Sequence, residues 1–148
     1  MIRRAVIQDV PVIAHMLRLL HDESPTFAEV PLDADFVIDN LIKMIEDEAT
    51  VFMIEPGEGF MVGRVVQTFF DPRLRLVEQL LYVLPGRRGT SLAVRLVRAF
   101  ELAGQHVGCK YIHVGSSTGI NTDEVVSMYS RLGYNPFGHT LRKDINVQ

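Results

Sequence analysis

The chain has 148 residues, of which 47% are hydrophobic and 22% charged, and its formal net charge is −3. This length suits a single domain over residues 1–148, and this composition supports a hydrophobic core and excludes a disordered tail. The balanced charge gives no reason to expect nucleic acid as a partner, because nucleic acid draws a basic surface. The single cysteine, Cys109, excludes an internal disulfide framework and a four-cysteine zinc site.

Neither a membrane segment nor a metal site is expected. No apolar run approaches the roughly 20 residues that cross a bilayer, and residues 1–9 lack the apolar stretch of a signal peptide. The five histidines are scattered without the spacing of metal ligands. We therefore expect a soluble, cytoplasmic protein that binds no metal.

Taken in chain order, the N-terminal third predicts a strand and two helices. Residues 2–7 look like a short strand, and Asp9 can then cap a helix whose apolar residues recur at helical spacing up to Leu20. The polar segment 21–31 contains two prolines and is expected to form a loop. A second helix is expected over about residues 33–48.

Three strands are expected in the middle of the chain. Residues 50–54 form a β-branched and aromatic run that ends at the turn 56–59. Segment 60–70 then returns, so the two segments predict an antiparallel hairpin. A long strand is expected over about residues 74–84.

In the C-terminal part, the pattern predicts helices that alternate with strands. A helix begins near Gly89, residues 111–114 form a short buried strand, a last helix spans about 123–132, and residues 134–145 supply one or two closing strands. The order β-α-α-β-β-β-α-β-α-β predicts an α/β fold with a mixed sheet and helices on both faces. The one crossover between parallel strands is expected to be right-handed.

The most informative stretch lies between the long strand and the helix that follows it. It reads Val83-Leu84-Pro85-Gly86-Arg87-Arg88-Gly89-Thr90-Ser91-Leu92-Ala93. Pro85 ends the strand because it lacks an N–H, and the two glycines permit a tight turn. The free N–H groups at the start of the helix form an anion site, beside which Arg87 and Arg88 add charge-assisted donors. A plain strand-to-helix turn with two solvated arginines has the same composition.

Two other kinds of phosphate-binding turn are excluded. No lysine follows the second glycine, as a P-loop requires, and the glycines lack the spacing of a dinucleotide fingerprint. The stretch instead resembles the coenzyme A signature of the GCN5-related N-acetyltransferase (GNAT) family, Q/R-x-x-G-x-G/A at a strand-to-helix junction, commonly preceded by V-x-P. Residues 88–93 match it with Ser91 in place of the middle glycine, and residues 83–85 match V-x-P.

The resemblance continues at both ends of the chain. Residues 2–5 followed by Asp9 are similar to the family's opening, I-R-x-A-x-x-x-D. Asn121 followed by residues 129–134 is similar to its ending, N…Y-x-x-x-G-F, with a gap one residue longer than the commonest spacing. The resemblance implies a GNAT-like, mostly antiparallel sheet with a splayed parallel pair at about 76–84 and 110–115, and helices on both faces.

The function that this resemblance implies is acetyl transfer from acetyl-CoA, the co-substrate, directly to a primary amine. The acceptor stays open among a protein lysine or N-terminus, an amino acid, a polyamine, an aminoglycoside and an aminoacyl-tRNA, and a homodimer is compatible with the resemblance. The implied coenzyme A site takes backbone groups from the end of the long strand, the turn, and one asparagine. These residues are Leu81, Tyr82, Val83, Arg87, Arg88, Gly89, Thr90, Ser91, Leu92, Ala93 and Asn121.

Two residues are candidates for the proton transfers. Similarity points to Glu78 as the general base; a carboxylate inside an apolar strand either faces solvent or occupies a pocket that raises its pKa. Tyr129 is the candidate general acid, or else a boundary tyrosine packed in the core. Cys109 is interpreted as an inert core residue, and His113 as a packed or pocket-lining residue. Because Ser91 departs from the signature, a GNAT-shaped module that binds coenzyme A or a partner without catalysis is the alternative.

Overall fold

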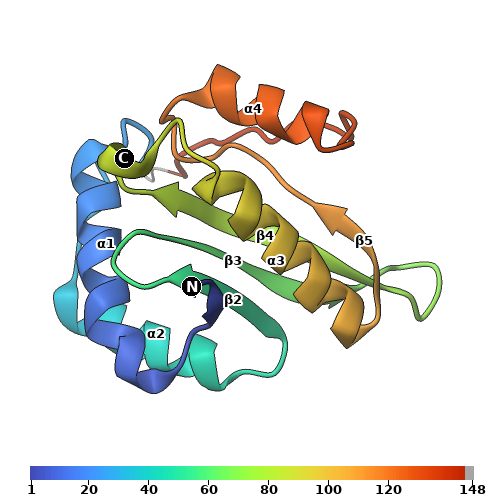
Figure 1. The fold of residues 1–148 in the computed structure, drawn as a ribbon, viewed down its shortest axis with the longest axis horizontal. Helices are drawn as coiled ribbons and strands as arrows, with labels where there is room; N and C mark the ends of the chain where they lie inside the picture. Colours follow the sequence, from blue (N-terminus) through green and yellow to red (C-terminus); the bar gives the residue numbers. More distant parts are fainter. Residues whose placement is uncertain (146–148) are drawn as a thin grey trace.

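The computed structural model describes residues 1–145, which are built around a five-stranded sheet of strand order β1-β2-β3-β4-β5 (Figure 1). The first four strands are antiparallel neighbours, and β4 and β5 are parallel. The strands are β1 (Arg3–Arg4), β2 (Thr50–Glu55), β3 (Gly59–Gln67), β4 (Leu74–Val83) and β5 (Cys109–His113). This mixed sheet with one parallel pair confirms the fold class that the sequence predicts.

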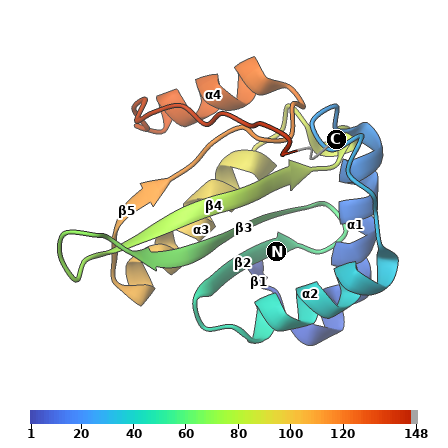
Figure 2. The ribbon, with the colours of Figure 1, turned by 180° about the vertical axis from the view of Figure 1, so that it is seen from behind.

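Four α-helices and two short 3-10 turns complete the described part of the chain. They are η1 (Ile7–Asp9), α1 (Val10–Glu23), α2 (Ala34–Glu46), η2 (Pro85–Arg87), α3 (Leu92–Val107) and α4 (Thr122–Arg131). Helices α1 and α2 pack on one face of the sheet and α3 on the other, with α4 beyond β5 (Figures 1 and 2). No helix within residues 1–145 combines the length and the apolar composition that a bilayer crossing requires.

The two-residue alternation of β2 separates two hydrophobic cores. Val51 and Met53 pack toward α3 and α4, whereas Phe52 and Ile54 pack toward α1 and α2. All four are buried, which is typical of a strand covered by helices on both sides. The uninterrupted apolar run in the sequence is therefore explained by this double coverage.

Local hydrogen bonds accompany the starts of α1 and α2, and the bonds of Asp9 before α1 differ from expectation. Asp33 caps α2, since its carboxylate accepts from the Phe36 N–H at 3.0 Å. Asp9 precedes α1 but makes no side-chain cap to it. Its carboxylate instead accepts from Val6 N–H at 2.8 Å and binds the Arg3 guanidinium at 2.7 and 2.9 Å. The strand expected over residues 2–7 is accordingly limited to β1.

The closing strands expected over residues 134–145 are absent, and that prediction is wrong. Pro136 has no N–H for a sheet ladder, and Gly138 weakens a strand. Phe137 and Leu141 are 84% and 92% exposed, so the apolar pattern of this segment has no core to face within residues 1–145. The edge of β5 that lies away from β4 therefore has no strand partner in the described part of the chain.

Candidate active site

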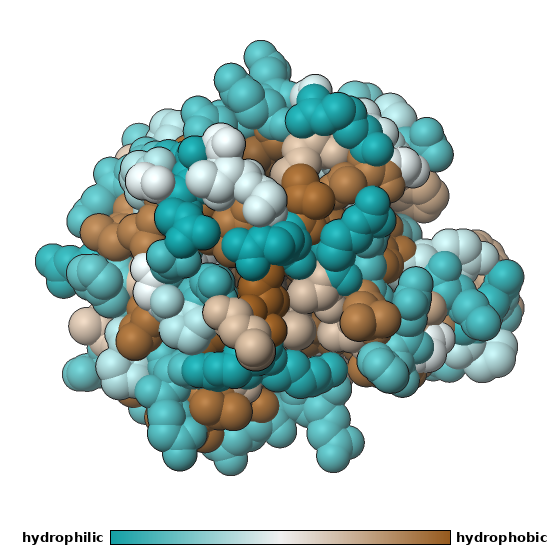
Figure 3. Space-filling model, viewed as in Figure 1, coloured by the Kyte–Doolittle hydropathy of each residue, from teal (hydrophilic) through white to brown (hydrophobic). Residues whose placement is uncertain are grey.

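A cleft opens where β4 and β5 separate. Their parallel pairing ends at Val77 and His113, whereas β4 continues to Val83. The cleft has a volume of about 400 Å³ and is lined by the second half of β4, the turn after it, the start of α3, the loop before α4, and α4 itself. Figure 3 shows hydrophobic residues between α4 and α3 in this region, with hydrophilic residues around them.

A β-bulge in β4 determines which side chains face this cleft. Gly63 of β3 pairs with Glu78 and its neighbour Val62 pairs with Leu80, so Gln79 has no partner in the register. Glu78 before the bulge and Leu81 after it both line the cleft, although they are an odd number of residues apart. The bulge therefore turns two consecutive parts of one strand toward the same opening.

Glu78 lies at the base of the splay and is half-buried there. Its Oε1 accepts from the Tyr129 hydroxyl at 3.4 Å and from the Gly115 N–H at 3.5 Å. Burial raises the pKa of this carboxyl to about 7, and the two hydrogen bonds offset only part of that effect. A carboxyl that titrates near neutral pH suits a general base, and this one lines the cleft.

Tyr129 reaches the site through Glu78. The tyrosine is 4% exposed, belongs to the core between α3 and α4, and makes an edge-on contact with Tyr134 at 5.2 Å. Burial and the nearby Glu78 charge raise the pKa of its hydroxyl, which therefore stays protonated and donates its hydrogen bond to Glu78, and Tyr129 itself does not line the cleft. Its position thus combines core packing with a hydrogen bond to the candidate base.

The turn after β4 leads directly into α3. Gly89 has a φ of +77°, a left-handed conformation that favours glycine. The Thr90 hydroxyl donates to the Arg87 carbonyl at 2.6 Å and accepts from the Leu92 N–H at 3.3 Å, which closes the turn. Because α3 begins at Leu92, its first-turn N–H groups have no acceptor inside the helix and suit an anion.

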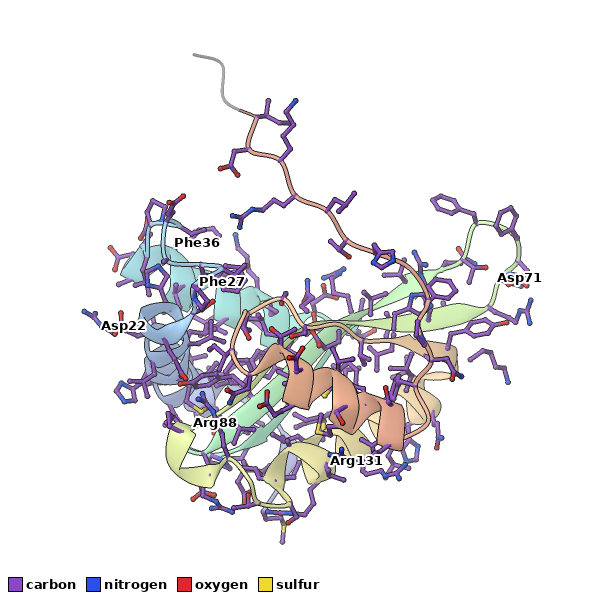
Figure 4. All side chains as sticks on the ribbon, turned by 90° about the horizontal axis from the view of Figure 1, so that it is seen from above. Asp22, Phe27, Phe36, Asp71, Arg88 and Arg131 are labelled. Carbon is purple, nitrogen blue, oxygen red and sulfur yellow. The ribbon has the colours of Figure 1, made fainter. Side chains whose placement is uncertain are left out.

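Both arginines of the turn are paired with carboxylates, which the sequence pattern does not reveal. The Arg87 guanidinium forms an ion pair with Glu58, which is 29 residues away in the sequence. Arg88 binds Glu23, 65 residues away, with one N–O distance of 2.7 Å, and its Nε donates to the Val83 carbonyl at 3.0 Å. Arg88 therefore joins the turn to α1, as Figure 4 illustrates.

Most of the predicted coenzyme residues line the cleft together. They are Leu81, Tyr82, Val83, Arg87, Arg88, Gly89, Thr90, Ala93 and Asn121. Ser91 and Leu92 do not line it: the Ser91 hydroxyl accepts from Arg95 at 3.3 Å, and Leu92 is fully buried in the core. Asn121 occupies the N-cap position of α4 in a left-handed conformation, φ +49°, without a side-chain cap.

The loop before α4 and one face of α4 were missed by sequence reasoning. The additional lining residues are Val94, Gly115, Ser116, Ser117, Thr118, Ile120, Glu124, Val125, Met128 and Arg131. Cys109 and His113 do not line the cleft, and burial raises the pKa of the Cys109 thiol and lowers that of the His113 ring. Within residues 1–145, no three potential ligand side chains cluster around a metal position.

No family model matches the sequence, and no curated protein is significantly similar to it. The fold has clear counterparts among solved structures. Aminoglycoside N-acetyltransferase AAC(6')-Iy in complex with CoA matches at a TM-score of 0.74 and 16% identity, over 97% of this chain and 93% of that chain. Glucosamine-6-phosphate N-acetyltransferase from Arabidopsis thaliana matches at 0.76 and 14%, over 99% and 98%. A transcriptional regulator from Bacillus halodurans C-125 matches at 0.81 and 14%, over 98% and 99%.

The chain therefore has the GNAT acetyltransferase fold, which confirms the fold that the sequence resemblance implies. At these identities the likeness defines the arrangement of the strands and helices.

Proposed function

We propose that this chain is an acetyl-CoA-dependent N-acetyltransferase that moves an acetyl group directly to a primary amine. The observation that carries the proposal is the position of Glu78. A carboxyl with a pKa of about 7 lies at the point where two parallel strands separate, in a cleft that leads to a helix N-terminus. This combination supplies a base and an anion site within one opening.

The cleft suits the parts of coenzyme A in order. Within residues 1–145 no strand pairs with the β5-facing edge of β4 beyond Val77, so the backbone groups of this edge, apart from the Val83 carbonyl that accepts from Arg88, are available to the amide-containing pantetheine arm as to an added strand. The turn 85–91 and the first-turn N–H groups of α3 would hold the pyrophosphate. The thioester would then lie toward Glu78, where the strands diverge.

The chemistry requires proton transfers at the amine nitrogen and at the thiolate sulfur. A primary amine is mostly protonated at neutral pH, and Glu78 accepts its proton, directly or through a water molecule. The amine nitrogen then attacks the thioester carbonyl carbon, so that a C–N bond forms and the C–S bond breaks. The thiolate leaves with the electron pair and takes a proton from Tyr129 or from water, and the second proton that the nitrogen loses as the amide forms returns to that donor. No covalent enzyme intermediate is needed, because both substrates lie in one site.

A small-molecule amine is the acceptor class that we propose to test first. The names of two fold relatives, an aminoglycoside and a glucosamine-6-phosphate N-acetyltransferase, describe amino sugars as acceptors. Protein amines, amino acids and polyamines share the same reacting group and are tested beside amino sugars.

Coenzyme binding is the direct test. Acetyl-CoA at about 100 times its dissociation constant is expected to stabilise the fold by about 2.7 kcal/mol, measured by thermal unfolding and calorimetry. Release of free thiol is then measured for each class of amine. An unchanged melting temperature at millimolar acetyl-CoA, together with no heat of binding, contradicts the proposal.

A coenzyme-binding module without catalysis is the second candidate. It is favoured by the replacement of the signature glycine with Ser91 and by the pairing of Arg87 and Arg88 with carboxylates. Acetyl-CoA binding without thiol release, across the whole panel of amines, would support this candidate over the transferase.

A further inference from the structure

Two consecutive residues at the C-terminal end of α1, Glu23 and Ser24, contact opposite walls of the cleft. One wall is the second half of β4 with the turn after it, and the other is the loop of residues 115–121 before α4. Glu23 binds the first wall and Ser24 binds the second. Neither residue lines the cleft, so neither side chain is placed to touch a bound coenzyme.

The contact with the first wall is a network around Arg88. Both carboxylate oxygens of Glu23 bind the Arg88 guanidinium, and Glu23 Oε1 also accepts from the Tyr82 hydroxyl at 3.2 Å. The guanidinium carbon lies 5.6 Å from the centroid of the Tyr82 ring. Because Arg88 Nε donates to the Val83 carbonyl, this network attaches the end of β4 to α1.

The contact with the second wall is buried. The Ser24 hydroxyl donates to the Thr118 carbonyl and accepts from the Phe27 N–H at 3.3 Å, with Ser24 only 1% exposed. Next to it, a Cβ on Gly119 would lie 2.8 Å from the Thr26 hydroxyl oxygen and 2.9 Å from Pro25 Cγ. The loop is therefore packed closely against the residues that follow α1.

These contacts matter because the sheet does not hold the two walls together. The hydrogen-bonded pairing of β4 and β5 ends at Val77 and His113, and the cleft lies beyond that point. Something outside the sheet has to fix the separation of the walls there. The end of α1 is bound to both walls through adjacent residues, whose side chains are held by two partners each.

We propose that Glu23 and Ser24 are positioning residues that set the width of the cleft and thereby the affinity for coenzyme A. For the identity of the ligand this inference rests on the proposed function. Losing either contact lets one wall move relative to the other, so that the pantetheine edge and the phosphate turn no longer bind one molecule at once. Affinity for the coenzyme falls, whereas the chemical step at Glu78 is unchanged once the coenzyme is bound.

The test compares Glu23→Gln, Ser24→Ala and the double variant with wild type. Each single variant is expected to raise the dissociation constant and the KM for acetyl-CoA about five- to ten-fold, because one hydrogen-bonded contact is lost, and the double variant raises them further. The value of kcat at saturating acetyl-CoA stays within about two-fold of wild type. Asp33→Ala removes the α2 cap at a residue that does not line the cleft, and it serves as a control that lowers the melting temperature but keeps wild-type coenzyme affinity.

A second measurement reports the wall separation without any coenzyme. Spin labels at Gly86→Cys and Ser117→Cys, in a Cys109→Ala background, lie on the two walls at exposed positions. The distance distribution between the labels is expected to widen in Ser24→Ala and Glu23→Gln. Wild-type coenzyme affinity in both variants, with an unchanged distance distribution, overturns the inference. If the wild-type protein binds no acetyl-CoA, the proposed function fails, and the label distances still decide whether α1 holds the walls.

Discussion

The two halves of β4 differ in what lies beside them. From Leu74 to Val77 the strand is hydrogen-bonded to β3 on one side and β5 on the other, whereas from Glu78 to Val83 only β3 pairs with it. The first half therefore has its backbone groups satisfied within the sheet, and the second half has a free edge that faces the cleft. A single strand thus contributes a structural half and a ligand-facing half.

The side chains of β4 also differ between the half that is paired on both sides and the half that faces the cleft. Leu76 is fully buried in the core under α3, two residues before Glu78, which is also inaccessible enough for its pKa to rise to about 7. Burying an ionisable carboxyl costs stability, and a leucine at this position would cost none. At Glu78 that cost falls where the strands separate and a proton acceptor can reach a bound substrate.

The largest expected effect is on turnover, and it comes from replacing Glu78, the candidate general base in the half of β4 that faces the cleft. Glu78→Gln keeps the shape of the side chain but cannot accept a proton. We expect turnover to fall by about 10²–10⁴-fold, with acetyl-CoA affinity retained. In the wild type, the rate is expected to rise with pH through about 7 as Glu78 ionises, and this limb is expected to vanish in the variant.

Steady-state kinetics over a pH range, together with calorimetry for acetyl-CoA, measure these two effects. Turnover of the glutamine variant at the wild-type rate would mean that the amine reaches the site already neutral, and that the enzyme works by proximity alone.

The free energy of unfolding is expected to be sensitive to substitution at the junction of the two halves of β4. Gly63 pairs with Glu78 across the bulge, and a Cβ there would contact the Val77 carbonyl oxygen and lie 2.7 Å from Phe100 Cζ. Gly63→Ala is expected to lower the free energy of unfolding by about 3 kcal/mol, because backbone and a buried ring would have to move. Gly86→Ala is the matched control: its Cβ would have no neighbour within 4 Å, and we expect a change within about 0.5 kcal/mol. Equal urea midpoints for the two variants would contradict the packing at the bulge.

The buried carboxyl also makes stability depend on pH. The pKa of Glu78 rises from an ordinary 4.5 to about 7 in the folded state, so folding disfavours its charged form. Below about pH 4.5 the group is neutral in both states and costs little; as pH rises through 7, the folded state has to bury the charge. We expect Glu78→Gln to gain about 3 kcal/mol of stability relative to wild type between pH 4.5 and pH 8, measured by urea unfolding. A stability difference that stays constant over this range would contradict the burial of the charged group.

Local patterns in the sequence predicted much of the fold and part of the site. The apolar run of residues 50–54 and the helical spacing of apolar residues in α1 and α3 indicate which side chains are buried. Such patterns extend over residues that are close in the sequence, so they can be recognised without knowledge of the fold. The strand-to-helix turn is also local, so the cleft-lining role of residues 87–90 could be predicted. The closing strands over residues 134–145 were wrong, because alternation alone supplies no neighbouring strand or core.

Long-range contacts could not be predicted in this way. The bulge at Gln79 depends on the register against β3, and the pairing of Arg88 with Glu23 joins residues that are distant in the sequence. The same holds for the loop before α4, which lines the cleft only because α1 packs against it. A sequence pattern shows which residue types are present in a turn, whereas the tertiary fold decides which charges are already paired.

The smallest expected effect concerns the hydroxyl of Tyr129, which contacts the ligand-facing half of β4 only through Glu78. Tyr129→Phe keeps the ring in the core and its contact with Tyr134, so we expect a stability loss below about 1 kcal/mol. If the hydroxyl protonates the leaving thiolate, turnover falls roughly ten-fold, about 1.4 kcal/mol in the barrier, with water as the slower donor. Removal of the hydrogen bond to Glu78 Oε1 is also expected to raise the pKa of that carboxyl, which moves the low-pH limb of the rate to higher pH. Turnover measured on the plateau above this limb separates the two roles: a loss that persists there assigns Tyr129 to proton donation, and wild-type turnover there makes it a packing residue that tunes the base.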